Sequence, residues 1–221
     1  MKKYIAAEIL GTFIIVFVGT GAMVLDEITI GAVTHFGVCL IWGIAVASAI
    51  LFAGRIHESH YNPAVTLALV VAGKFSAKKS VEHISAQIIG AILASIILYL
   101  IFPKNPTLGS TLPSISIWST AGIEIVISFL LMASIAAIDI LKIKNKTLPA
   151  IIIGTVVLLM AYFAGPLTGA SMNPARSIGP AIISGHTEYI LVYLFAPILG
   201  MLLAVPLYKI KKRSKDVSAA K

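Results

Sequence analysis

Two copies of the tripeptide Asn-Pro-Ala lie 111 residues apart, as Asn62-Pro63-Ala64 and Asn173-Pro174-Ala175. Asparagine is a favoured N-cap and proline is favoured at the first helical position, so each tripeptide predicts the start of a helix. A capping asparagine accepts a backbone N–H through its side-chain oxygen, which leaves its amide NH2 free to donate to a passing molecule. Together with two positive helix-dipole ends, the pair is suited to an uncharged oxygen and opposes a cation.

Both predicted helices are short. The apolar runs Thr66–Ala72 and Ile178–Ile183 give helices of about ten residues, roughly half of what a hydrocarbon core of about 30 Å requires. Half-helices with polar starts are typical of a membrane protein whose site lies at mid-depth. The alternative is that each asparagine merely caps a buried helix, and the presence of two motifs in matching positions argues against it.

Arg176 stands immediately after the second tripeptide, whereas Val65 occupies the matching position after the first. A guanidinium carries five donors and a fixed charge, so it can bind a solute oxygen while it repels cations. The alternative role for Arg176 is a salt bridge to a carboxylate in a loop.

Glu8 and Glu124 are the carboxylates that lie well inside long apolar stretches. An isolated charge at such a position is costly and needs partners. One hypothesis is a proton or ion relay. The other is that both side chains are structural acceptors for loop N–H groups, and their matching placement favours this second hypothesis.

The composition indicates a membrane protein that is not an enzyme. Hydrophobic residues make up 58% of the 221 positions and charged residues 12%, which is more apolar surface than a soluble domain can bury. The five histidines form no metal-spaced cluster, and the single cysteine, Cys39, is expected to pack in an apolar run. Because the sequence contains no nucleotide-binding loop and no nucleophile–base set, we expect no catalysis, no metal and no cofactor.

Apolar stretches predict an all-α membrane fold with six transmembrane helices in one channel domain, residues 1–221. The predicted spans are Tyr4–Leu25, Val33–Ala53, Val81–Phe102, Ile117–Ile138, Leu148–Ala164 and Tyr189–Tyr208. The two half-helices fall between the second and third spans and between the fifth and sixth. If both re-enter the membrane without crossing it, the two termini lie on the same side.

The charge distribution orients this topology. The basic residues on the side of the termini are Lys2, Lys3, Lys74, Lys78, Lys79, Lys142, Lys144, Lys146, Lys209, Lys211, Lys212, Arg213, Lys215 and Lys221. The loops on the other side contain Asp26, Glu27, Lys104, His186 and Glu188. The positive-inside rule therefore predicts cytoplasmic termini. The basic tail, residues 209–221, is read as a topology signal rather than a nucleic-acid site.

The two halves of the chain, about 1–103 and 117–210, repeat each other. Glu8–Phe13 matches Glu124–Phe129 at an offset of 116 residues. Small residues at every fourth position, which let helices approach closely, recur at an offset of 110, as Ala86, Gly90, Ala94 and Ala196, Gly200, Ala204. With three crossings in each half, the second half enters from the opposite face, so the sequence predicts an inverted repeat.

Over essentially its whole length, and most closely at Gly169–Pro180, the chain resembles the aquaporin, or major intrinsic protein, family. The resemblance implies a right-handed bundle of six helices with two re-entrant half-helices, one pore per subunit and a homotetramer in the lipid. It also implies that Asn62 and Asn173 are the central donors and that Arg176 belongs to the outer constriction.

By the family's spacing, the other constriction residues are Trp42, Ala161 and Ala170. This set is similar to that of the nodulin-like branch and of glycerol facilitators, whereas strict water channels usually carry histidine at the second position. Ala161 leaves that space open, and Trp42 supplies a flat apolar wall for carbon backbones.

The chain departs from the family pattern at three places. Ser177 follows the arginine where facilitators usually have aspartate, and Tyr193-Leu194 matches neither usual pair. Glu58 replaces a glycine in the loop before the first tripeptide, which predicts an altered cytoplasmic vestibule.

These features predict a passive channel in the cell (plasma) membrane for water and small neutral solutes such as glycerol, closed to protons and ions. Urea, ammonia and neutral metalloid acids are further candidate solutes. The alternatives are a strict water channel, an ion- or proton-coupled secondary transporter and a closed junction protein. A coupled transporter would need an ionisable pair at the midplane besides Arg176. No nucleic-acid partner is expected.

Overall fold

The structure is a computed structural model that describes residues 2–57, 60–143, 145 and 147–208. Regular secondary structure in these residues is helical: α1 (Lys3–Ile28), α2 (His35–Phe52), η1 (Ala53–Arg55), α3 (Pro63–Val71), α4 (Ala77–Ile101), α5 (Ile117–Ile140), α6 (Thr147–Thr168), α7 (Pro174–Ser184) and α8 (Ile190–Ala204). Glu58, Lys144, Lys146 and the basic tail, on which expectations above rest, lie outside the described residues.

Five of the six predicted spans, now α1, α2, α4, α5 and α6, are long and apolar enough to cross a membrane. The sixth helix, α8, is shorter than the predicted Tyr189–Tyr208, with 15 residues. A turn at Val205 and Pro206 interrupts the predicted stretch. Proline has no N–H to continue the helical hydrogen bonds, which explains the early end.

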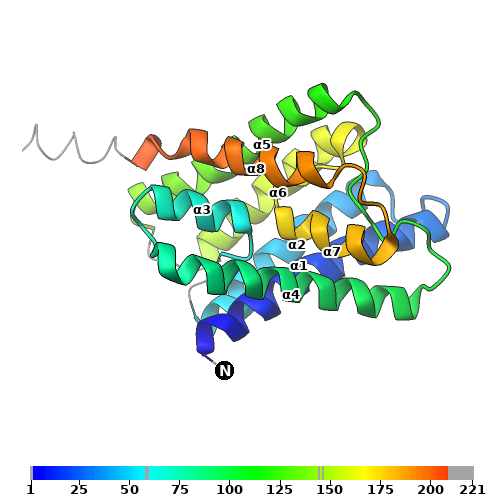
Figure 1. The fold of residues 1–221 in the computed structure, drawn as a ribbon, viewed down its shortest axis with the longest axis horizontal. Helices are drawn as coiled ribbons and strands as arrows, with labels where there is room; N and C mark the ends of the chain where they lie inside the picture. Colours follow the sequence, from blue (N-terminus) through cyan, green and yellow to red (C-terminus); the bar gives the residue numbers. More distant parts are fainter. Residues whose placement is uncertain (1, 58–59, 144, 146, 209–221) are drawn as a thin grey trace, which may run out of the picture.

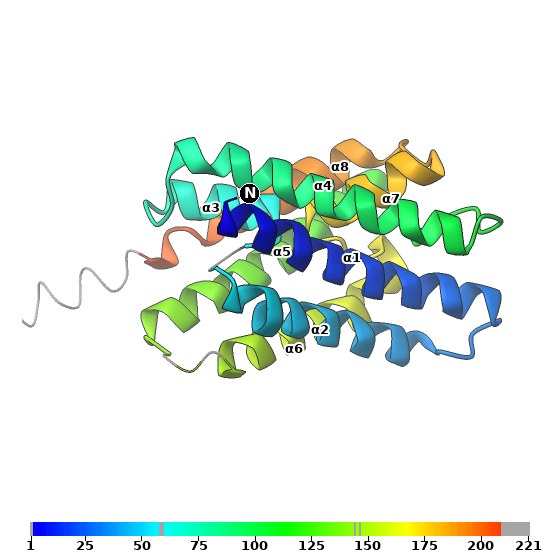
Figure 2. The ribbon, with the colours of Figure 1, turned by 90° about the horizontal axis from the view of Figure 1, so that it is seen from below.

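The long helices run side by side along one axis, with α3 toward one end of the molecule and α7 toward the other (Figures 1 and 2). Helix α1 packs on α4, α5 on α8 and α2 on α6. Each half-helix contacts its own neighbour and also a helix of the other half, because α3 packs on α8 and α7 packs on α4. These exchanged contacts tie the two halves of the chain together.

Two glycines set the closest helix contacts. A Cβ added to Gly90 would lie 2.4 Å from the carbonyl oxygen of Ile9, and one added to Gly200 would lie 2.2 Å from that of Ile125. Both distances are too short for any side chain, so the small residues allow the close approach predicted for them. Ile9 and Ile125 occupy matching positions in the two halves, so the α1–α4 and α5–α8 contacts are the same contact made twice.

The two predicted half-helices are present. Helix α3 has 9 residues and α7 has 11, which makes them about 14 Å and 17 Å long. Each begins with proline directly after its asparagine, and Asn62 and Asn173 have extended backbones with φ of −154° and −152°. Local capping chemistry therefore places both helix starts where the sequence predicts them.

Candidate pore and selectivity site

The two asparagines cap their half-helices in the same way. The Oδ1 atom of Asn62 accepts the backbone N–H of Ala64 at 2.9 Å, and Oδ1 of Asn173 accepts that of Ala175 at 3.0 Å. These bonds satisfy donors that a helix start leaves without an intrahelical partner. They also fix each side-chain amide, so that both NH2 groups point toward the meeting point of the two loops.

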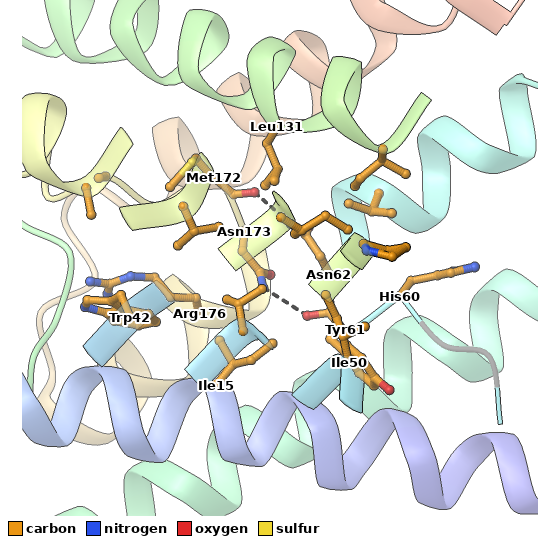
Figure 3. Close-up of a pocket in the computed structure, with 18 of the residues that line it drawn as sticks. Ile15, Trp42, Ile50, His60, Tyr61, Asn62, Leu131, Met172, Asn173 and Arg176 are labelled. Atoms are coloured by element: carbon orange, nitrogen blue, oxygen red, sulfur yellow. Dashed lines mark hydrogen bonds between the residues drawn. The ribbon is translucent and has the colours of Figure 1, made fainter. Parts of the chain in front are cut away.

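The amide NH2 groups are not wholly free, which corrects the expectation from the sequence. Nδ2 of Asn62 donates to the carbonyl oxygen of Met172 at 2.8 Å, and Nδ2 of Asn173 donates to that of Tyr61 at 2.9 Å. Figure 3 shows the two asparagines facing each other, with these bonds running to the opposite loops. Because an amide carries two hydrogens, one on each side chain remains to donate to a passing molecule.

The residue before each asparagine has a strained backbone. Tyr61 and Met172 have φ of 55° and 52°, in the left-handed region that side chains other than glycine rarely adopt. Such a conformation costs on the order of 1–3 kcal/mol and persists only where the surroundings hold it. The conformation lets each of these residues direct its carbonyl oxygen to the asparagine of the other half.

The backbone N–H groups of the first loop are held by Glu8. The Glu8 carboxylate accepts the N–H of His60 at 2.7 Å and that of Tyr61 at 2.8 Å. The Nε2 amide of Gln87 donates to the same carboxylate at 2.9 Å. Glu8 is fully buried, with 0% of its surface exposed. These three donors compensate for the burial of its carboxylate.

Glu124 makes the matching contacts in the second half. It accepts the N–H groups of Ser171 at 2.8 Å and Met172 at 3.0 Å, and the Thr168 hydroxyl at 2.8 Å. Like Glu8, it is 0% exposed and does not line the central cavity. These contacts are the ones expected of structural acceptors, although the Glu8 carboxylate also lies 3.8 Å from Nε2 of His83.

Arg176 is buried, with 2% of its surface exposed, and is held by several groups. Its Nη1 donates to the carbonyl oxygen of Gly109 at 3.1 Å and to Oγ1 of Thr111 at 2.7 Å. Its Nη2 donates to Sδ of Met23 at 3.3 Å, and its Cζ lies 4.7 Å from the centroid of the Trp42 ring. The ion pairs among the described residues do not include Arg176, so the salt-bridge alternative finds no support.

One cavity of about 1370 Å³ joins the two ends of the bundle. It extends from His35 and Pro166 at one end to Lys142 and Asn145 at the other. It is lined by both asparagines and by the whole predicted constriction set, Trp42, Ala161, Ala170 and Arg176. The rest of its middle wall is largely apolar and includes Ile15, Val65, Leu131 and Val157.

The comparison with known families agrees with this geometry. Residues 1–208 match the family model described as Major intrinsic protein. The chain belongs to the major intrinsic protein family. The resemblance drawn from the paired tripeptides is thus confirmed, and with it the prediction that the protein is a membrane channel and not an enzyme.

Individual relatives place the chain near the nodulin-like branch, as predicted. It is 38% identical to aquaporin NIP1-2 of Oryza sativa subsp. japonica over 204 residues, which cover 89% of this chain and 67% of that protein. It is also 38% identical to probable aquaporin NIP4-2 of Arabidopsis thaliana over 202 residues, 91% of this chain and 71% of that one.

A solved structure supports the fold. The aquaglyceroporin from Plasmodium falciparum superposes with a TM-score of 0.86 at 24% sequence identity, covering 99% of each chain. The predicted all-α, aquaporin-like membrane fold is therefore confirmed.

Several residues that hold Arg176 and Trp42 in place were not predicted from the sequence. Gly109, Thr111 and Met23 hold Arg176, although they lie on a loop and a helix far from it in the chain. Gly19 makes room for the indole of Trp42, because a Cβ there would lie 2.4 Å from a ring carbon. No spacing rule in the sequence links these residues to their partners.

Two departures from the family pattern have structural roles. The Ser177 hydroxyl lies 2.7 Å from that of Thr111 and 2.6 Å from that of Ser171. The Tyr193 hydroxyl donates to the carbonyl oxygen of Thr168 at 2.6 Å. Both side chains therefore hold the segment that leads into the second half-helix. The third departure, Glu58, lies outside the described residues.

Proposed function

We propose that this protein is a passive channel that conducts water and small uncharged solutes such as glycerol and excludes protons and other ions. The observation that carries the proposal is one continuous cavity that passes both asparagines and Arg176 between the two ends of the bundle. Membership of a channel family and the similarity to NIP-type aquaporins support it.

At the centre of the cavity, Asn62 and Asn173 provide two donors in a lining that is otherwise largely apolar. A water or hydroxyl oxygen that passes the half-helix starts can accept from both remaining amide hydrogens. The rest of the middle lining is largely apolar, so these donors orient the passing molecule. A cation gains nothing from donors and meets two positive dipole ends, which disfavours its passage.

At the outer constriction, we assign solute selection to Trp42, Ala161, Ala170 and Arg176. The contacts described above occupy three of the five guanidinium N–H groups, so two remain for a solute oxygen. The indole can pack against carbon atoms, and the alanine methyl groups leave space beside it. A polyol can therefore exchange its hydration for matching contacts on both faces.

We assign structural roles to Glu8 and Glu124. A proton-coupled transporter would need an ionisable pair at the midplane, besides Arg176, that the solute or its coupled ion can reach. These two carboxylates are buried behind the loops and saturated with donors, which favours passive conduction over coupling.

We also propose that the protein lies in the plasma membrane as a homotetramer with cytoplasmic termini. The positive-inside distribution supports the orientation. The family resemblance supports the tetramer, and exposed apolar residues on the outer helix faces, such as Phe163, Leu191 and Phe195, suit contact with lipid. Tag accessibility in intact cells and native mass spectrometry from mild detergent test the orientation and the subunit number.

The decisive experiment is reconstitution into proteoliposomes with stopped-flow recording of water, glycerol and proton movement in the same preparation. We expect water and glycerol permeability above that of empty liposomes and no added proton flux. Water flux without glycerol flux would make the protein a strict water channel. Glycerol uptake that depends on a proton gradient would support a coupled transporter instead.

A further inference from the structure

Three hydroxyl groups connect the guanidinium of Arg176 to the segment that carries Asn173. Nη1 of Arg176 lies 2.7 Å from Oγ1 of Thr111, which lies 2.7 Å from Oγ of Ser177. Oγ of Ser177 lies 2.6 Å from Oγ of Ser171, which lies 3.1 Å from the carbonyl oxygen of Asn173. All three hydroxyl-bearing residues are at most 5% exposed. We call Thr111, Ser177 and Ser171 the hydroxyl relay.

The two ends of the hydroxyl relay fix the direction of its hydrogen bonds. Arg176 can only donate, so the Thr111 oxygen accepts from it and the Thr111 hydrogen points to Ser177. The carbonyl of Asn173 can only accept, so Ser171 donates to it and accepts from Ser177. The hydroxyl relay therefore has one consistent orientation, and each bond in it polarises and strengthens the next.

The first half of the chain uses the matching positions differently. Thr66 corresponds to Ser177, and its hydroxyl donates to the carbonyl oxygen of Asn62 at 3.0 Å. Its other neighbours are Nδ1 of His60 at 3.1 Å and Nε2 of Gln87 at 3.0 Å. That cluster continues from Gln87 of α4 to the Glu8 carboxylate at 2.9 Å, and its hydrogen bonds among the described residues do not reach an arginine. The connection between a charged constriction and a central asparagine is thus specific to the second half.

We propose that Thr111 and Ser177 are positioning residues that determine solute selectivity, because the hydroxyl relay holds Arg176 in register with Asn173. The inference rests on the proposed function, since it assigns selection to the constriction that Arg176 forms. Without the Thr111 hydroxyl, the guanidinium loses a charge-assisted hydrogen bond; without the Ser177 hydroxyl, Thr111 loses the partner that orients it. In both cases the guanidinium keeps Gly109 and Met23 as partners. It then moves more freely over Trp42, and the constriction admits larger polyols.

The test compares Thr111→Val, Ser177→Ala and the double variant in proteoliposomes. The readout is the ratio of erythritol to glycerol permeability, which does not depend on how much channel is incorporated. We expect each single variant to raise the ratio roughly threefold or more. The double variant should match Thr111→Val alone, because both changes break the same chain of bonds. A Ser177→Ala ratio equal to wild type, or effects that multiply in the double variant, would overturn the proposal.

Matched variants separate positioning from general damage. Thr111→Ser and Ser177→Thr retain the hydroxyls and should restore the wild-type ratio. Ser110→Ala removes the neighbouring hydroxyl, whose bond to Ser184 at 2.9 Å joins the same loop to α7 without reaching Arg176. A rise in the ratio with Ser110→Ala equal to that with Ser177→Ala would assign the effect to loop packing and overturn the proposal.

The relay test remains separate from the test of the proposed function. If wild-type channels carry no glycerol, the proposed function fails, and the same variants are then compared by the ratio of proton to water permeability. If Thr111→Val does not fold, Ser177→Ala and its Ser177→Thr counterpart decide the question alone.

Discussion

The guanidinium of Arg176 lies over the indole of Trp42, with 4.7 Å between Cζ and the ring centroid. The two residues come from α7 and α2, and their cation–π contact fixes two walls of the proposed constriction relative to each other (Figure 3). Each is also supported from behind, Trp42 against Gly19 and Arg176 by the loop around Thr111. Under the proposed function, the size of the opening then depends on the small residues Ala161 and Ala170, which also line the cavity.

Replacing Ala161 with histidine should suppress glycerol permeability far more than water permeability. An imidazole would occupy the open space in the lining and add a donor suited to water, while a polyol needs room for its carbon chain. Stopped-flow measurement of both fluxes in proteoliposomes checks this, with Ala161→Ser as a control of nearly unchanged size. If glycerol and water fall by the same factor, Ala161 does not line the constriction.

Replacing Arg176 with valine should admit protons or small cations while water flux remains largely intact. A fixed positive charge adds to the several kcal/mol that an ion already loses in a poorly solvated constriction, and valine removes that charge. Current recordings from oocytes, paired with swelling assays, measure both properties. Arg176→Lys keeps the charge without the planar fork and should conduct fewer ions than the valine variant. Unchanged ion conductance in both variants would leave exclusion to the half-helix dipoles.

Replacing Gly19 with alanine should reduce glycerol permeability more than water permeability. The new Cβ would lie 2.4 Å from the Trp42 ring, so the indole must shift, and the cavity lies on its open side. Gly122→Ala is a matched control, because a Cβ at that glycine of α5 meets nothing within 4 Å. Equal fluxes in the Gly19→Ala variant and wild type would show that α1 yields instead of the indole.

Replacing Glu8 or Glu124 with glutamine should lower stability by about 1–3 kcal/mol in each case, because the amide NH2 cannot accept the loop N–H groups. Thermal unfolding in detergent measures the loss, and the two variants should behave alike. Asp139→Asn, which removes a half-exposed ion pair with Lys74, should change stability little. A normal unfolding temperature combined with altered proton movement would instead favour a proton pathway through these two carboxylates.

Much of the framework of this channel follows from the sequence alone, because the interactions that define it are local. The Asn-Pro start of each half-helix depends on capping bonds within three residues of Asn62 and Asn173. The long apolar helices follow from stretches that only lipid can solvate. Glu8 and Glu124 are recognisable as a matched pair because each lies in the first long helix of its own half, ahead of that half's Asn-Pro-Ala loop.

The tertiary structure decided how these parts hold one another. The amide of Asn62 bonds to Met172, the guanidinium of Arg176 is held from Thr111, and the indole of Trp42 rests on Gly19. These partners are separated by more than twenty positions along the chain, and often by more than sixty. Such contacts depend on the distances between packed helices and on the paths of two loops. No local propensity or spacing encodes them, so only the assembled bundle selects which side chains meet.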